Sequence, residues 1–216
     1  MIDLKIGIIG AVAYGLLHAN TLERNNIEYD LFEKKKPGRK LLASGNGRCN
    51  ISNSRLTDIS YPNNEWAYNF VNDNQKELFD LFKELNIYTS VDNEGRMYPI
   101  SESSQSIYNI LMKNIHHLIE LDCTEIIKRN GKYYINKEYG PYDKIVVSIG
   151  SNASITDKYS YSLLDSIGVD INPFKPSLVG FRVSLKTKEI SGVRQKCSIS
   201  LIKDDRILYQ EKGEII

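Results

Sequence analysis

The sequence predicts an α/β protein in which a doubly wound, mainly parallel sheet is followed by the start of a second, mainly β domain. Residues 1–33 read in turn as strand, glycine turn, helix and strand, which is how a doubly wound sheet opens. Strand-like stretches separated by turn formers return to that sheet and end at Gly150. From Pro173 onward, alternating strand-like segments replace the mixed helix and strand patterns.

The opening unit can be followed element by element. Residues 6–9 form a short apolar run bounded by glycines, which predicts a buried strand. Apolar residues between positions 11 and 22 recur at helical spacing, so we expect a helix packed closely on the sheet. The stretch 28–32 predicts a second strand, which ends at Glu33.

A polar loop at residues 38–53 leads into a helical segment at about 62–118, where two groups of apolar residues repeat at helical spacing. Turn formers such as Asn130-Gly131 and Gly140-Pro141 then separate short strand-like stretches, which predicts a small antiparallel excursion before the chain returns to the main sheet. These stretches are 119–127, 132–136 and 144–149.

The change of pattern at Pro173 predicts a domain boundary. We assign residues 1–172 to the doubly wound domain and residues 173–216 to the beginning of a β-rich domain. The strand-like segments of the second part are 178–185, 196–203 and 206–210.

Bulk composition argues against several kinds of partner. The 216 residues carry 28 Lys and Arg against 27 Asp and Glu, so overall charge gives no reason to expect nucleic acid or an anionic membrane as the main partner. Apolar residues make up 41%, but no apolar run approaches the roughly 20 residues of a membrane helix. The N-terminus lacks the pattern of a secretion signal, so we expect a cytoplasmic protein.

The cysteines and histidines show neither disulfide nor metal spacing. The cysteines are odd in number and contain no Cys-x-x-Cys pair, so we expect no disulfide framework and no metal site. Cys49 invites a redox-thiol interpretation, but without a partner nearby in sequence the interpretation as a small packed residue is favoured. The residues concerned are Cys49, Cys123, Cys197, His18, His116 and His117.

The turn from Gly10 to Gly15 keeps the two outer glycines of a dinucleotide-binding fingerprint and has Val12 at the middle position. A glycine there lets the backbone approach a pyrophosphate, and a β-branched residue puts methyl groups in its place, so either the loop shifts or nucleotide binding weakens. Glu33 lies 23 residues after Gly10, where an acidic residue can hydrogen-bond ribose hydroxyls. The alternatives are an ordinary strand–helix turn and a solvated carboxylate.

The loop at residues 38–53 is rich in glycine and asparagine, which tolerate left-handed backbone, and it carries Arg39, Lys40 and Arg48. This combination suits a flat, anionic ligand. The same basic residues, with the lysines at 34–36, could instead bind RNA phosphates. The near-neutral chain and the lack of an aromatic platform in the loop rank RNA binding third.

The run Gly-Arg-Lys-Leu-Leu-Ala-Ser-Gly-Asn-Gly-Arg-Cys-Asn, residues 38–50, closely resembles the signature of the HI0933-like (YhiN/BaiN-type) flavoproteins. These are FAD-binding proteins described as NAD(P)/FAD-dependent or aminoacetone oxidase-like oxidoreductases. Further stretches resemble family segments in the same order, so the resemblance spans essentially the whole chain. They are residues 95–101, 148–150 and 175–179.

The resemblance implies an FAD/NAD(P)-binding, Rossmann-like fold with FAD as cofactor. It places Gly10, Gly15 and Glu33 at the ADP half of FAD, and Arg39 and Lys40 near its ribose and phosphates. It further implies that the backbone of Ile126 lies near the adenine. The positions that would line the flavin side are Ser44, Gly45, Gly47, Arg48, Cys49 and Asn50, and Gly150 ends the strand that faces the cofactor.

The implied function is an FAD-dependent oxidoreductase that acts on an unidentified small molecule, with NAD(P)H as a candidate electron donor. The flavin would carry the hydride or electrons, and the backbone donors of the loop with Arg48 would stabilise negative charge on its ring. No residue qualifies as a general acid or base, so the catalytic residues stay unknown. The alternative is a truncated or diverged relative that binds nucleotide weakly and catalyses nothing.

Three departures from the family pattern support that alternative. Val12 replaces a glycine, and the stretch 151–161 contains no glycine where the family is glycine-rich. The chain also ends at Ile216, whereas relatives continue through an inserted domain and return to complete the sheet. We therefore expect a partner chain or self-association to cover an otherwise exposed apolar sheet edge.

Overall fold

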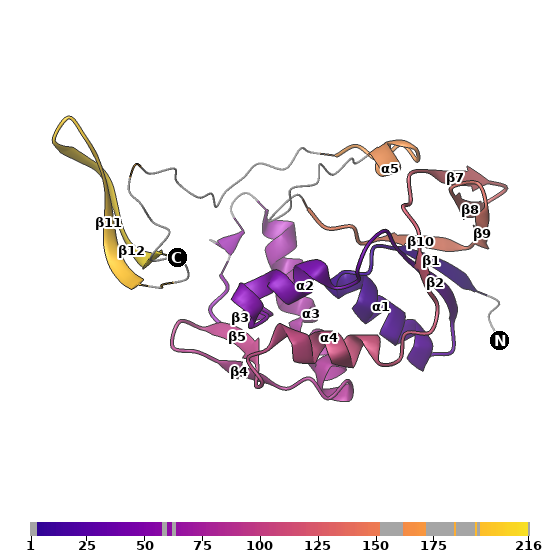
Figure 1. Ribbon diagram of the computed structural model, residues 1–216, viewed down its shortest axis with the longest axis horizontal. Coiled ribbons are helices and arrows are strands. Elements are labelled where there is room, and N and C mark those ends of the chain that lie inside the picture. Colours follow the sequence, from indigo (N-terminus) through magenta and orange to yellow (C-terminus); the bar gives the residue numbers. More distant parts are fainter. Residues whose placement is uncertain are drawn as a thin grey trace. The chain divides into compact units, whose positions relative to one another are not determined.

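The larger unit of the computed structural model contains a four-stranded parallel sheet with the order β10-β1-β2-β6, and Figure 1 shows β10, β1 and β2 side by side next to α1. The structure describes residues 4–57, 60–61, 64–151, 162–171, 184, 193 and 195–215. The chain divides into two units, Met1–Phe174 and Lys175–Ile216, and each is described by itself.

Strand β1 occupies the middle of the sheet, between β2 and β10. It runs parallel to both, with Ile8 opposite Leu31 on one side and Val146 on the other. Chain order leads from β1 through α1 to β2 and β6, and only later to β10 on the other side, so the strand order reverses between β1 and β10. The elements are β1 (Lys5–Ile9), α1 (Ala13–Arg24), β2 (Glu28–Glu33), β6 (Leu118–Glu120) and β10 (Lys144–Val147).

The helical segment after the loop contains more strand than the sequence predicts. Two helices are present, but the hairpin β4–β5 lies between them, and β3 pairs with β5 to complete a three-stranded antiparallel sheet. The elements are α2 (Arg39–Ala43), the 3₁₀ turn η1 (Ser44–Gly47), β3 (Ser52–Asn53), α3 (Glu65–Glu84), β4 (Thr89–Val91), β5 (Arg96–Pro99) and α4 (Ser104–Met112).

The antiparallel excursion is confirmed, as the three-stranded sheet β7-β8-β9. The single strand predicted at 119–127 is wrong, because β6 and β7 belong to different sheets. The side chain of Asn136 holds the break between them: its oxygen accepts from the backbone N–H groups of Thr124 and Glu125, and its amide donates to the Asp122 carbonyl. The elements are β7 (Ile126–Arg129), β8 (Lys132–Ile135), β9 (Tyr139–Tyr142) and α5 (Ser162–Asp165).

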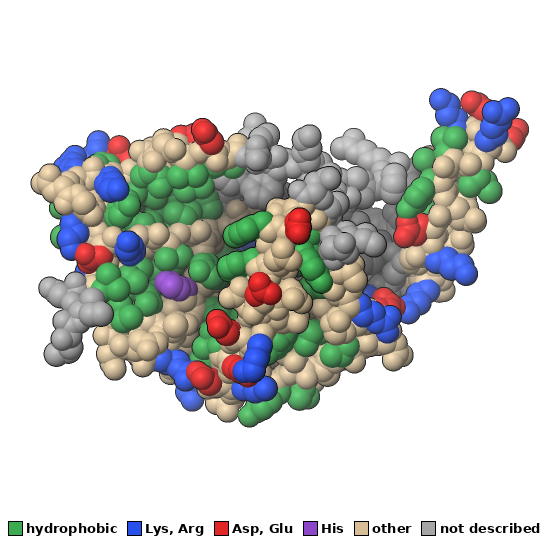
Figure 2. Space-filling model, turned by 180° about the vertical axis from the view of Figure 1, so that it is seen from behind, with side chains coloured by type: hydrophobic (Ala, Val, Ile, Leu, Met, Phe, Trp, Pro, Cys, Tyr) green, Lys and Arg blue, Asp and Glu red, His purple; other side chains and the backbone are tan. Residues whose placement is uncertain are grey.

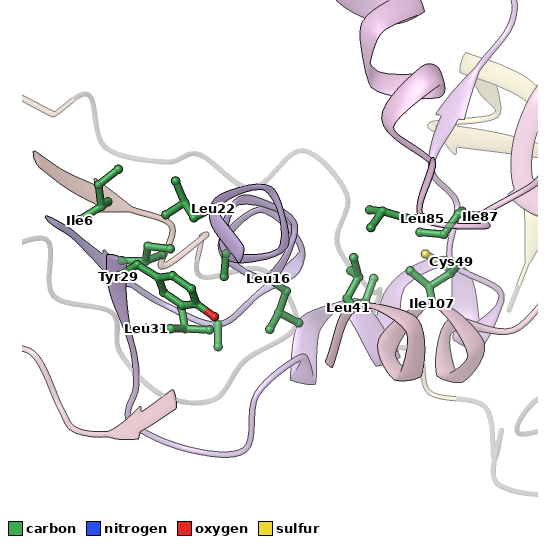
Figure 3. Close-up of a cluster of buried hydrophobic side chains, with 14 residues drawn as sticks. Ile6, Leu16, Leu22, Tyr29, Leu31, Leu41, Cys49, Leu85, Ile87 and Ile107 are labelled. Atoms are coloured by element: carbon green, nitrogen blue, oxygen red, sulfur yellow. The ribbon is translucent and has the colours of Figure 1, made fainter. Parts of the chain in front are cut away.

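The main core joins the sheet to the helices that carry the loop. Figure 3 shows Leu16 and Leu22 of α1 beside Tyr29 and Leu31 of β2, and a second group around Leu41, Cys49 and Ile107. Asn20, which is 1% exposed, donates to the Leu16 carbonyl at 2.8 Å and to the Leu111 carbonyl at 2.6 Å. This buried amide therefore ties α1 to the end of α4.

The second unit contains the antiparallel hairpin β11 (Gln195–Lys203) and β12 (Arg206–Ile215). The register places Ile199, Leu201 and Tyr209 on one face, and each is more than two-fifths exposed. The boundary at Pro173, the glycine-free stretch 152–161 and, apart from residue 184, the segment predicted at 178–185 lie outside the described residues.

Charged side chains are mixed rather than sorted by sign on the face shown in Figure 2. Lys and Arg lie among Asp and Glu, with hydrophobic side chains between them. Exposed aromatic residues include Trp66 and Phe70 of α3, whose rings stack with centroids 5.3 Å apart.

Candidate functional site

The turn between β1 and α1 requires glycine at both outer positions. Gly10 has φ of 99°, and a Cβ there would lie 2.7 Å from the Ser148 carbonyl oxygen. A Cβ on Gly15 would lie 2.0 Å from the Gly10 carbonyl oxygen. The two glycines thus allow helix α1 to start directly against the ends of β1 and β10.

Val12 is the N-cap residue of α1 and has an ordinary extended backbone, with φ −94° and ψ −170°. Valine adopts such angles readily, so this position does not need the conformational freedom of glycine. The sequence predicted either a shifted loop or weaker nucleotide binding at Val12. Backbone strain gives no reason for the loop to shift. What valine adds is the bulk of a half-buried side chain next to the first-turn N–H groups of α1, where helices bind phosphate.

Glu33 lies at the end of β2 and faces this turn. Its carboxylate accepts hydrogen bonds from the Ala11 N–H at 2.9 Å and from the Lys35 N–H at 3.1 Å. Each carboxylate oxygen can accept a further hydrogen bond, so the group is both held in place and able to receive ribose hydroxyls.

The 38–53 loop starts beside the same turn. The Gly38 N–H donates to the Ala11 carbonyl at 2.7 Å, and α2 follows directly. The Lys40 ammonium donates to the Ile149 carbonyl at 3.2 Å and also to the Ser151 carbonyl. Burial lowers the pKa of Lys40, and the Glu33 carboxylate opposes that shift.

The end of β10 closes the other side. Gly150 has φ of 74°, and a Cβ there would lie 2.7 Å from the Lys40 Nζ. The Ser148 hydroxyl donates to the Gly10 carbonyl at 2.5 Å, with the Ile9 carbonyl 3.2 Å away. The turn, Glu33, α2 and the end of β10 therefore meet where the strand order reverses, the usual ligand position of such a sheet.

The glycine-rich part of the loop has a mostly left-handed backbone. Gly45, Asn46, Gly47 and Cys49 have φ between 53° and 83°. A Cβ on Gly47 would meet nothing within 4 Å, so packing does not require glycine there, whereas a φ of 83° does. Successive N–H groups in such conformations form concave sites that suit anions and polarised ring atoms.

Cys49 is a packed residue in this loop. It is 5% exposed and belongs to the same core cluster as Leu41 and Ile107. Burial raises the pKa of its thiol, and a hydrogen bond with Ser44 only partly opposes the shift. A thiol that stays protonated is a poor nucleophile, so the structure supports the packing role.

Arg48 is held by an aromatic ring. Its guanidinium carbon lies 4.6 Å from the centroid of the Tyr98 ring, and Nη2 donates to the Tyr98 hydroxyl at 3.4 Å. Tyr98 lies on β5 and is 4% exposed. Arg39 and Asn50, in contrast, have exposed side chains.

Ile126 is separate from the loop and is 1% exposed. Its N–H donates to the Ser166 hydroxyl at 3.1 Å, and its carbonyl oxygen lies 3.1 Å from the same hydroxyl. Ser166 follows α5 and also donates to the Leu163 carbonyl at 2.6 Å. An adenine contact of the Ile126 backbone stays a prediction, and Ser166 is a competing partner for that backbone.

Sequence reasoning missed the roles of Ser148, Tyr98 and Ser166. Each acts through a contact to a residue at least 40 positions away, which no local pattern reveals. Ser148 and Tyr98 at least lie within segments that resemble the family, whereas Ser166 lies outside all of them.

The donor set fits a dinucleotide with a planar ring. It combines a helix N-terminus whose first turn holds no acidic residue, a carboxylate at the end of the second strand, and a loop of mostly left-handed backbone that carries an arginine. The described residues contain no group of three or more His, Cys, Asp and Glu that could hold a metal ion. Among them, no helix is long and apolar enough to cross a membrane.

The parallel sheet with its reversal of strand order defines a Rossmann-type domain. The chain belongs to the HI0933-like family, because the model of that family, described as "HI0933-like protein Rossmann domain", matches residues 4–197.

One relative is the 3-dehydro-bile acid delta(4,6)-reductase of Clostridium scindens (strain ATCC 35704 / DSM 5676 / VPI 13733 / 19). It is 27% identical over 228 residues, which cover 98% of this chain and 56% of the reductase. The chain thus spans about half the length of this relative. The crystal structure of Thermovibrio ammonificans THI4 matches 62% of this chain and 46% of its own, with 13% identity and a TM-score of 0.38.

Proposed function

We propose that the chain binds FAD and forms the cofactor-binding part of an FAD-dependent oxidoreductase that acts on a small molecule. The observation that carries this proposal is the meeting of the Gly10–Gly15 turn, Glu33 and the 38–53 loop at one edge of the parallel sheet. In the domain organisation we propose, residues 1–172 hold the cofactor and residues 173–216 begin an inserted β-rich domain.

Each part of the site has a task in binding. The turn and the first N–H groups of α1 would receive the pyrophosphate, and Arg39 would add positive charge nearby. Glu33 would accept from the ribose hydroxyls. Residues 44–50 would surround the flavin, and Gly150 would leave room beside it.

When bound, the flavin supplies hydride and electron transfer. The chain's own contribution is to bind and orient it. Arg48, held by Tyr98, would stabilise negative charge on the ring through a fixed guanidinium, because a positive group that needs no reorganisation acts most effectively. We propose NAD(P)H as electron donor.

Visible absorbance tests the proposal. We expect the purified chain to be yellow, or to take up added FAD. Glu33→Gln should weaken FAD binding by about tenfold, the effect of losing one hydrogen bond to a charged group. Glu28→Gln, at the exposed start of the same strand, is the matched control and should bind like the wild type. A chain that is colourless and takes up no FAD would refute the proposal.

A second candidate function is a non-catalytic relative that binds nucleotide weakly. Val12 favours it, because a bulky, half-buried residue occupies the N-cap of α1, the helix whose first-turn N–H groups would receive the pyrophosphate. Val12→Gly decides between the two candidates: restored FAD uptake would show that this side chain was the obstruction. We do not propose RNA binding, because Lys40 and Arg48 point to β10 and Tyr98.

A further inference from the structure

The segment 148–151, which follows β10, is joined by side-chain hydrogen bonds to the two parts of the candidate site, the Gly10–Gly15 turn and helix α2. Ser148 donates its hydroxyl to the Gly10 carbonyl at 2.5 Å, across 138 positions of sequence. Lys40 donates its ammonium from α2 to the Ile149 and Ser151 carbonyls, across 109 and 111 positions. We call this group, Lys40 with the segment 148–151, the β10 clasp.

The clasp contacts the turn through the Gly10 carbonyl and not through the N–H groups of the turn that would bind a ligand. The Ser148 hydroxyl holds the Gly10 carbonyl, the same oxygen that a Cβ on Gly15 would approach to 2.0 Å. Because the peptide unit between Gly10 and Ala11 is planar, holding this carbonyl also sets the direction of the Ala11 N–H, which donates to the Glu33 carboxylate.

Lys40 holds the other part of the site, helix α2, in place. Helix α2 begins one residue after Gly38, whose N–H is bonded to the Ala11 carbonyl. The ammonium then crosses to β10, and Gly150 supplies the space, because a Cβ there would lie 2.7 Å from Nζ. The turn, α2 and the end of β10 thus form a closed ring of contacts.

We propose that Lys40 and Ser148 are positioning residues that hold the phosphate turn and the start of the flavin loop at a fixed separation. This inference rests on the proposed function, because the separation matters only to a ligand that spans the turn and the loop. It differs from the role that the family resemblance implies for Lys40, a direct contact with ribose or phosphate.

Hydrogen exchange of the chain without ligand tests the clasp directly. Ser148→Ala and Lys40→Met should each speed amide exchange in peptides covering residues 9–15 and 144–151 by at least about fivefold, the effect of one lost hydrogen bond. Ser90→Ala on exposed β4 and Arg39→Met beside Lys40 are matched controls and should exchange like the wild type.

Titration with FAD at several salt concentrations adds a readout that a purely structural role would not move. Ser148→Ala should weaken FAD binding by about fivefold with an unchanged salt dependence, because no charge is lost. Lys40→Met should weaken it and keep most of the salt dependence, whereas Arg39→Met should reduce that dependence.

The outcomes separate the two proposals. If the wild type binds no FAD, the proposed function fails, and hydrogen exchange still decides the clasp. Wild-type exchange in both Ser148→Ala and Lys40→Met overturns the clasp. So does a Lys40→Met variant that exchanges normally but loses FAD affinity together with its salt dependence, since that result makes Lys40 a phosphate ligand.

Discussion

Substitution of Gly15 by alanine is the sharpest test of the turn. The new Cβ would lie 2.0 Å from the Gly10 carbonyl oxygen and 2.5 Å from the Ser148 Oγ, and real Cβ atoms essentially never come within 3.0 Å of such neighbours. The first obstacle is backbone, so α1 has to move away from β1 by about 1 Å. That movement separates Leu16 and Ala19 from the sheet, where both are fully buried.

The cost of this movement exceeds the gain from alanine. Alanine in place of glycine stabilises a helix by about 1 kcal/mol, whereas an overpacked core costs about 1–3 kcal/mol or more and here also opens the α1 contact. Because the clash with backbone puts the cost at the upper end of this range, we expect a net loss of about 2 kcal/mol in the free energy of unfolding, and a Tm lower by roughly 4–8 °C.

Urea unfolding followed by circular dichroism measures this loss. Gly213→Ala on β12, where a Cβ meets nothing within 4 Å, is the control and should change stability by less than about 0.5 kcal/mol. A Gly15→Ala variant as stable as the wild type would show that the turn does not need glycine and that the close approach of α1 is wrong.

Three further predictions follow from buried or half-buried groups. Val12→Gly should bind FAD more tightly but unfold about 0.5–1 kcal/mol more easily in urea, since glycine loses more backbone entropy on folding. Asn20→Ala should lower the free energy of unfolding by about 2 kcal/mol through loss of its two buried amide bonds. Burial raises the pKa of Cys123 to about 12, above the value of about 8.5 in an unfolded chain. Its neutral thiol therefore favours the folded state below the unfolded pKa, and that stability is lost as the pH rises from about 9 to 12, so Cys123→Ala should flatten the loss in urea titrations.

Each of these three has a result that contradicts it. Equal FAD affinity of Val12→Gly and the wild type would mean that the valine side chain does not approach the ligand. An Asn20→Ala variant of normal stability would mean that α1 and α4 are held by packing alone. Parallel pH curves for Cys123→Ala and the wild type would show that this thiol is not buried in solution.

The sequence predicted the parts of the fold that depend on local pattern. The run 6–9, the helical spacing after it and Glu33 identified β1, α1 and β2, because burial on a sheet imposes a regular spacing on apolar residues. The prediction of one strand over 119–127 was wrong, because the break between β6 and β7 is made by the side chain of Asn136, which follows both in sequence. The β4–β5 hairpin was missed for a related reason: its strands are three and four residues long, too short for a period to show.

By itself, the sequence determined the family, the class of cofactor we propose and the glycines of the turn, because each depends on residue types at fixed local spacing. Only the tertiary structure decided that Val12 is unstrained, that Cys49 is packed, and that Lys40 reaches the end of β10. These facts depend on which distant groups come within a few ångströms, and hydrogen bonding and burial act only at that range. Distances between residues far apart in sequence are fixed only when the chain folds, so local patterns do not reveal them.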